Sequence, residues 1–162
     1  MTALILFIVA SFTDFLDGML ARFLGQESKL GELLDPIADK IIVATALILL
    51  VMDGTIRHYE VIAAIIILTR EILISGLREF LAKGRIKLPV SNLAKLKTVL
   101  QMISIGLLLS GETGNKIINF QDYNAQTIGI ILLWLSAALT LFTGYDYMRK
   151  GIDHAISEDN KD

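Results

Sequence analysis

The sequence predicts an all-α membrane protein, a polytopic bundle of transmembrane helices in a single domain. Hydrophobic residues make up 54% of the 162 residues, and charged residues only 20%. The mean hydropathy is +0.61, whereas a soluble domain of this size usually carries more charge and fewer apolar residues. Only two prolines, Pro36 and Pro89, interrupt a chain that otherwise favours helices.

The first two apolar segments each join an apolar run to a group of carboxylates. A transmembrane helix needs about 20 mostly apolar residues to cross about 30 Å of hydrocarbon. The segment from Met1 to about Leu24 is apolar as far as Thr13 and becomes polar at Asp14. The segment from about Gly31 to Met52 begins with carboxylates and continues as an almost unbroken apolar run. The short turn between the two segments predicts antiparallel neighbouring helices.

Three more apolar segments complete the expected bundle. They run from about Glu60 to Phe80, from about Leu93 to Ser110 and from about Ala125 to Tyr147. None shows the strict alternation of a β-strand, so all five segments are expected to be helical spans. The membrane domain would then cover residues 1–150, and residues 151–162 would form a polar C-terminal tail.

The positions of the basic residues predict how the bundle is oriented. If the five segments alternate in direction, thirteen of the fifteen Lys and Arg residues lie on one side of the membrane. The other side receives only Arg57 and Lys116. Cytoplasmic loops carry the excess of Lys and Arg, so the carboxylate groups are expected to face the cytoplasm.

Charge, cysteine content and the first residues exclude several classes of function. The net charge of −2 indicates no nucleic-acid partner, and the absence of cysteine excludes disulfides and thiolate chemistry. Met1 is followed at once by apolar residues, without a basic stretch or a small-residue cleavage site. A secretory signal peptide is therefore not expected.

Four aspartates are placed to converge where the first two segments meet. Asp14 and Asp17 are three residues apart at the end of the first helix, and Asp35 and Asp39 are four apart in the second. Each pair therefore shares a helix face. A single aspartate at a helix end is usually a cap or a solvated residue, but four carboxylates near hydrocarbon repel one another and need a cation.

Carboxylate oxygens are the ligands that hard divalent cations prefer, and Mg²⁺ in particular shares them with substrate phosphates. Two such ions about 4 Å apart could bind the attacking and leaving oxygens of a displacement at phosphorus. An EF-hand is excluded because the spacing is wrong and the surroundings are apolar. The sequence therefore predicts a cytoplasm-facing site for divalent metal at the membrane boundary.

The whole stretch from Asp14 to Asp39 reads D-x2-D-G-x2-A-R-x8-G-x3-D-x3-D. This pattern resembles the signature of the CDP-alcohol phosphatidyltransferases. The segments Arg70–Glu79 and Lys95–Met102 are similar to those of the bacterial phosphatidylglycerophosphate synthases within that family. The resemblance covers most of the chain, from about Ser11 to Lys150.

The resemblance implies an enzyme of the bacterial inner membrane that transfers phosphatidyl from CDP-diacylglycerol to sn-glycerol 3-phosphate, releasing CMP. It implies two divalent cations, Mg²⁺ or Mn²⁺, and a homodimer in contact with membrane lipid. The metal ligands would be Asp14, Asp17, Asp35 and Asp39. Asp39 would also be the catalytic base that takes the proton from the glycerol hydroxyl. The residues that bind the CDP-lipid would be Gly18, Ala21, Arg22, Ser28 and Gly31.

A second, cationic group should hold the phosphate of the acceptor. The candidates are Arg70, Arg78, Lys95 and Lys97. Arg70 stands in an apolar helix, where a charge usually marks a functional site, although a salt bridge to Glu71 or to an active-site aspartate would also account for it. The two lysines could instead be basic anchors at the membrane interface.

Two alternatives and one departure accompany the resemblance. The acceptor could be inositol phosphate, serine or phosphatidylglycerol, and a divalent-cation transporter could also use an aspartate cluster. Family members carry an additional first helix, opened by an Asn-Pro segment, that does not precede Met1 here. Five helices are therefore expected where the family has six, as for a chain truncated at its N-terminus.

Overall fold

The computed structural model describes residues 3–9, 13, 29–83, 92–120 and 123–159, and these residues are predominantly helical. Residues 3–9 are helical near the N-terminus. Four long helices follow, which are α2 (Lys29–Met52), α3 (Glu60–Lys83), α4 (Asn92–Ile117) and α5 (Ala125–Asp159). Between α4 and α5 lies a hairpin of two short strands, β1 (Asn119–Phe120) and β2 (Tyr123–Asn124).

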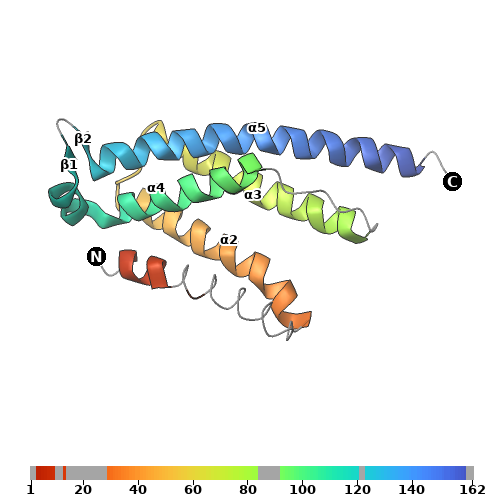
Figure 1. Cartoon of the computed structure of the whole chain (residues 1–162), viewed down its shortest axis with the longest axis horizontal. Coiled ribbons are helices and arrows are strands. Elements are labelled where there is room, and N and C mark those ends of the chain that lie inside the picture. The colour runs from red at the N-terminus through yellow and green to blue at the C-terminus, as the bar shows by residue number, and fades with distance from the viewer. Residues whose placement is uncertain (1–2, 10–12, 14–28, 84–91, 121–122, 160–162) are drawn as a thin grey trace.

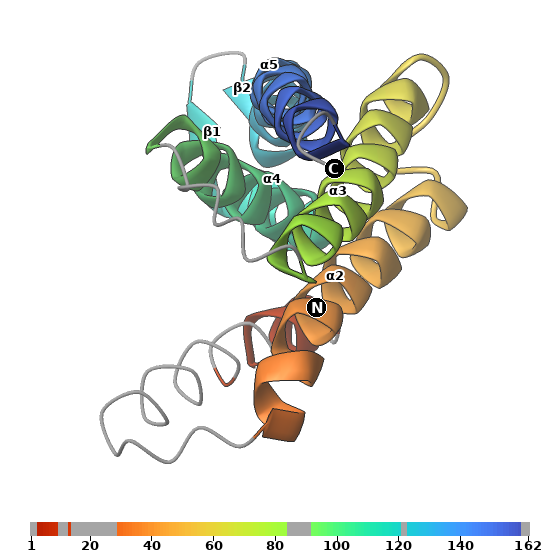
Figure 2. The ribbon, with the colours of Figure 1, turned by 90° about the vertical axis from the view of Figure 1, so that its right-hand side faces the viewer.

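The helices form an antiparallel bundle in which successive members reverse direction (Figure 1). Helix α5 packs along both α3 and α4, and α2 lies against the other side of these two helices (Figure 2). The first residues of α2 and the last residues of α3 and α5 lie toward the same end of the bundle (Figure 1, right). The expectation of an all-α helical bundle is confirmed.

Side-chain caps lie at the starts of two helices, and a glycine bends a third. The N–H of Arg57 donates to the Glu60 carboxylate (3.0 Å), and the N–H of Thr127 donates to the Asn124 side chain (2.9 Å). These contacts satisfy N–H groups that the first turn of a helix leaves unpaired. Gly111 interrupts α4 with φ 55° and ψ −140°. Glycine adopts this left-handed conformation without steric cost, so the helix can bend there.

The apolar core lies where α2, α3, α4 and α5 meet. Small residues such as Ala46 and Ala64 allow the helices to approach closely, and Leu47, Ile67 and Ile105 fill the space between them. The other buried apolar members are Phe7, Val43, Leu50, Ile56, Ala63, Leu108, Leu133 and Ala137. This core holds the helices rigidly in line, which fixes the polar groups at one end of the bundle.

The outside of the bundle is strongly apolar, as is typical of a surface that faces lipid. Large apolar side chains stay exposed on every long helix, for example Ile48, Ile65, Ile103 and Phe142. Among the described residues, α4 and the part of α5 from Ala125 to Arg149 are long and apolar enough to cross a membrane. The expected spans in α2 and α3 carry more charge, because they contain candidate site residues.

Candidate active site

The expected site divides between described and undescribed parts of the chain. Six of its residues lie outside the described residues, namely Asp14, Asp17, Gly18, Ala21, Arg22 and Ser28. Gly31 and Asp35 belong to α2, where the structure describes their backbone only. Asp39, Arg70, Arg78, Lys95 and Lys97 are described in full.

Asp39 is an exposed residue in the first half of α2. The helix is continuous from Lys29 to Met52, so positions 35 and 39 follow one another along one helix face. The carboxylate of Asp39 lies close enough to Lys97 of α4 and to neighbouring Lys40 for their charges to interact. The expected catalytic residue and one of the expected acceptor residues are therefore near each other.

Arg70 and Lys97 meet on a single carboxylate, that of Glu71. Arg70 of α3 is only 8% exposed and Lys97 of α4 only 4%. The Arg70 guanidinium lies 3.4 Å from Glu71 Oε1, and the Lys97 ammonium contacts the same oxygen. The salt bridge considered for Arg70 from the sequence is thus present, and it also includes the lysine.

Helix α5 provides the other partners of the cations. Arg70 Nη2 donates to Thr143 Oγ1 at 2.9 Å. Arg78 Nη2 donates to the Tyr147 hydroxyl at 3.0 Å, and the Arg78 guanidinium lies 4.8 Å from the centre of the Tyr147 ring. This arrangement combines a hydrogen bond with a cation–π contact. The charges of Arg70, Arg78, Lys40 and Lys97 interact with one another through space.

We call Arg70, Arg78 and Lys97 the cationic cluster, together with Glu71, which contacts Arg70 and Lys97. Lys40 of α2 lies beside it. Several cations held close together in a bundle of apolar helices repel one another, and the arrangement is favourable only when an anion is near. With Lys40 the site has four cations, and the carboxylates of Glu71 and Asp39 neutralise only two of them, so the cluster is suited to bind a multiply charged anion such as a phosphate.

Lys95 is separated from this cluster by the geometry of α4. It is exposed, whereas Lys97 is buried. Two residues along an α-helix correspond to a rotation of about 200°, so the two lysines point to nearly opposite sides. The role of Lys95 in acceptor binding stays a prediction without support from its position.

Gly144 of α5 allows α3 and α5 to approach each other at Arg70. A Cβ atom at this position would lie 3.1 Å from Arg70 Cγ and 3.3 Å from Arg70 Nε. Ordinary van der Waals contacts of a Cβ start at about 3.4 Å. The absence of a side chain therefore leaves the space in which the stem of Arg70 lies.

Three residues of this arrangement were not predicted from the sequence, Thr143, Gly144 and Tyr147, and Glu71 was considered only as a salt-bridge partner of Arg70. Glu71 is a second charge within the apolar run of α3, and such a charge indicates function as much as that of Arg70 does. Thr143 and Tyr147 are four residues apart and so share a face of α5. No local pattern indicated which helix this face would contact.

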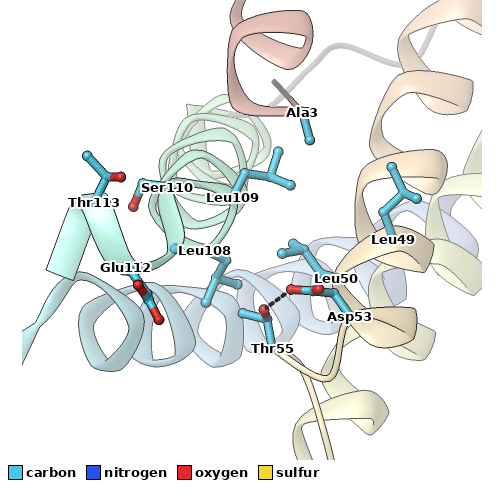
Figure 3. A pocket seen from close by; sticks show the side chains of 11 residues that line it. Ala3, Leu49, Leu50, Asp53, Thr55, Leu108, Leu109, Ser110, Glu112 and Thr113 are labelled. Carbon is cyan, nitrogen blue, oxygen red and sulfur yellow. Dashed lines mark hydrogen bonds between the residues drawn. The ribbon is translucent and has the colours of Figure 1, made fainter. Parts of the chain in front are cut away.

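One hollow borders the cationic cluster and another lies far from it. A groove of about 460 Å³ between α3 and α5 opens on the outside of the bundle, with Arg70 and Gly144 among its lining residues. Another, of about 480 Å³, lies at the opposite end of the bundle, next to the bend of α4 (Figure 3). There Thr55 donates a hydrogen bond to Asp53 at 3.0 Å, and Glu112 lies on the far side. Its described lining includes none of the expected site residues.

The described side chains include only part of the expected metal site. Within the described ranges, no group of three or more carboxylate or histidine side chains is arranged to hold a metal ion. Only Asp39 of the four expected ligands has a described side chain. The expected site therefore depends on Asp14, Asp17 and Asp35 as well.

The model of the CDP-alcohol phosphatidyltransferase family matches residues 1–142. The chain belongs to this family. The match includes all four aspartates and the whole cationic cluster. Membership identifies the chain as a CDP-alcohol phosphatidyltransferase enzyme, which favours catalysis over the alternative of a cation transporter.

Three relatives share one name. A protein of Rickettsia bellii is 43% identical over 92% of this chain and 78% of its own length. One of Cereibacter sphaeroides is 38% identical over 96% of this chain and 84% of its own length. One of Haemophilus influenzae is 40% identical, with coverage of 90% and 74%. Each is named CDP-diacylglycerol–glycerol-3-phosphate 3-phosphatidyltransferase.

Proposed function

We propose that this phosphatidyltransferase transfers the phosphatidyl group of CDP-diacylglycerol to sn-glycerol 3-phosphate, giving phosphatidylglycerophosphate and CMP. The observation that carries the proposal is the cationic cluster beside Asp39, with buried Arg70 and Lys97 as its centre. An acceptor that carries a phosphate needs such fixed cations, whereas serine does not. The names of the relatives agree with this choice of acceptor.

The four aspartates would hold two divalent cations, Mg²⁺ or Mn²⁺. Their oxygen donors suit these ions, and the unbroken helix α2 places positions 35 and 39 on one face. The bound ions would neutralise charge on the diphosphate of the CDP-lipid. The CDP-lipid itself would lie against Gly18, Ala21, Arg22, Ser28 and Gly31. Arg22 suits the diphosphate because its planar guanidinium can donate to two oxygens at once.

The chemical step is a displacement at the lipid-bearing phosphorus. A glycerol hydroxyl loses its proton to the carboxylate of Asp39, and its oxygen forms a bond to that phosphorus. The bond from the phosphorus to CMP breaks in line with the attack. The cationic cluster would hold the acceptor's phosphate and so orient the hydroxyl toward Asp39.

The enzyme would sit in the bacterial inner membrane with its site on the cytoplasmic side. The apolar exterior and the two long apolar helices support a membrane location. The excess of Lys and Arg at the end where α3 and α5 finish supports the orientation. The five spans, the division at residue 150 and the homodimer are parts of the same proposal. Helix α5 continues to Asp159, so much of the proposed polar tail is helical.

The proposal is tested by incubating the purified protein with labelled CDP-diacylglycerol, Mg²⁺ and one acceptor at a time. We expect phosphatidylglycerophosphate and an equal amount of CMP from sn-glycerol 3-phosphate. Turnover with serine, inositol phosphate or phosphatidylglycerol but not with sn-glycerol 3-phosphate would refute the proposed acceptor. The Asp39→Asn variant should lose turnover but still bind the CDP-lipid. Unchanged turnover would remove Asp39 as the base.

A further inference from the structure

Glu71 places a negative charge within the cationic cluster, where a site that binds an anion would not be expected to have one. Its Oε1 accepts from the Lys97 ammonium and lies 3.4 Å from the Arg70 guanidinium. The Glu71 side chain is 22% exposed, and those of Arg70 and Lys97 are 10% and 5% exposed. A negative charge thus lies between the two most buried cations of the site.

Several donors of these two cations already have protein partners, whereas Arg70 Nε is buried without one among the described residues. Arg70 Nη2 is bound to Thr143, Arg70 Nη1 is directed at Glu71, and Lys97 Nζ contacts Glu71. A phosphate that binds Arg70 or Lys97 therefore comes close to these acceptors. Glu71 is the charged one, and two anions cannot stay close together without strong repulsion in a site of low dielectric.

We infer that Glu71 is a resident counter-ion of the acceptor-phosphate site, which holds Lys97 and Arg70 until the phosphate of the acceptor displaces it. This inference rests on the proposed function, because it takes the cationic cluster as the place where that phosphate binds. Before the acceptor arrives, Glu71 keeps two buried cations charged and close together. Once the phosphate is bound, it takes over this role and Glu71 loses its contact with Lys97.

The inference makes a prediction that differs from that of a purely structural salt bridge. If Glu71 competes with phosphate for Lys97, then the neutral Glu71→Gln side chain should let phosphate bind more tightly. The acceptor-free protein should at the same time become less stable, because two buried cations lose their counter-ion. If Glu71 only holds the two cations in place, its loss should weaken phosphate binding instead.

The experiment measures the melting temperature of the purified full-length protein in lipid nanodiscs, without divalent cation, as inorganic phosphate is added. A ligand that binds only the folded state stabilises it by RT ln(1 + [L]/Kd), so the rise of the melting temperature with phosphate concentration gives the Kd. We expect Glu71→Gln to melt lower than the wild type without phosphate. Its Kd for phosphate should be lower by about tenfold, the effect of removing one charged competitor.

Glu79→Gln is the matched control, because it makes the same change of charge at an exposed position of the same helix. Its phosphate response should equal that of the wild type. Lys97→Met should abolish most of the response, and in this background Glu71→Gln should have no further effect. If Glu71→Gln does not fold, Glu71→Asp carries the test, since its shorter side chain withdraws the carboxylate from Lys97.

The inference is overturned if Glu71→Gln, or Glu71→Asp in its place, responds to phosphate like the wild type or more weakly. This outcome differs from failure of the proposed function. If the wild type makes no phosphatidylglycerophosphate from sn-glycerol 3-phosphate, the function is wrong. If it does so and Glu71→Gln binds phosphate no more tightly, only the role of Glu71 is wrong.

Discussion

Replacing Gly144 by alanine tests whether the position of Arg70 controls acceptor binding. The new Cβ would lie 3.1 Å from Arg70 Cγ and 3.3 Å from Arg70 Nε, so the arginine must move by a few tenths of an ångström. Its hydrogen bond to Thr143, now 2.9 Å, would lengthen or lose alignment. The guanidinium would then be misplaced relative to Glu71 and Lys97.

Gly144→Ala should change acceptor binding more clearly than it changes the stability of the protein. Overpacking typically costs about 1–3 kcal/mol. The change from glycine to alanine within a helix recovers roughly 0.5–1 kcal/mol. The melting temperature should therefore fall only slightly. Partial loss of a hydrogen bond to a charged group, about 1 kcal/mol, corresponds to a rise of about fivefold in the KM for sn-glycerol 3-phosphate.

The assay follows CMP release at saturating CDP-diacylglycerol while sn-glycerol 3-phosphate is varied. Gly106→Ala is the matched control, because a Cβ at position 106 meets nothing within 4 Å and the residue lies nine positions from Lys97 in the same helix. The control should keep the acceptor KM of the wild type. The reasoning is refuted if Gly144→Ala also keeps that KM within twofold while the protein remains folded.

Three further predictions concern the partners of the cations and the metal. Thr143→Val removes the oxygen to which Arg70 Nη2 donates, and an unpaired donor costs about 1–3 kcal/mol. The KM for sn-glycerol 3-phosphate should therefore rise at least fivefold, while the KM for the CDP-lipid stays the same. An unchanged KM for sn-glycerol 3-phosphate would exclude this contact from substrate binding. Tyr147→Phe keeps the ring near Arg78 but loses the hydroxyl, whereas Tyr147→Leu also loses a cation–π contact of about 0.5–1 kcal/mol. The KM for sn-glycerol 3-phosphate should therefore rise less in Tyr147→Phe than in Tyr147→Leu. Equal rises in the two variants would exclude a role for the ring. Chelation should abolish turnover, and Mg²⁺ or Mn²⁺ should restore it; full activity in excess chelator would contradict the aspartate site.

The helices were predictable because each depends on local composition. The expected segments 31–52, 60–80 and 125–147 begin within two residues of α2, α3 and α5. The expected fourth segment ends at Ser110, next to the bend at Gly111, after which α4 continues to Ile117. The hairpin of β1 and β2 was not expected, since strands of two residues leave no pattern that the sequence could reveal.

The site was predictable in kind but not in its contacts. Charges within apolar helices indicated Arg70 and the aspartates, because such charges are costly unless they are used. Helical periodicity could have distinguished Lys97 from Lys95 in advance. By contrast, the contact of Arg70 with Thr143 joins residues 73 positions apart and depends on how α3 packs against α5. The space at Gly144 depends on the same packing, which no local pattern encodes.

The most direct test of the central claim measures formation of phosphatidylglycerophosphate by wild type and Lys97→Met as sn-glycerol 3-phosphate is varied. If the cluster binds the acceptor's phosphate beside Asp39, the KM of the variant for sn-glycerol 3-phosphate should rise more than about tenfold, because one charge-assisted contact is lost. Its kcat should change less than this KM, because the substitution keeps Asp39 and the residues proposed to bind the CDP-lipid. An unchanged KM for sn-glycerol 3-phosphate in Lys97→Met would contradict the account.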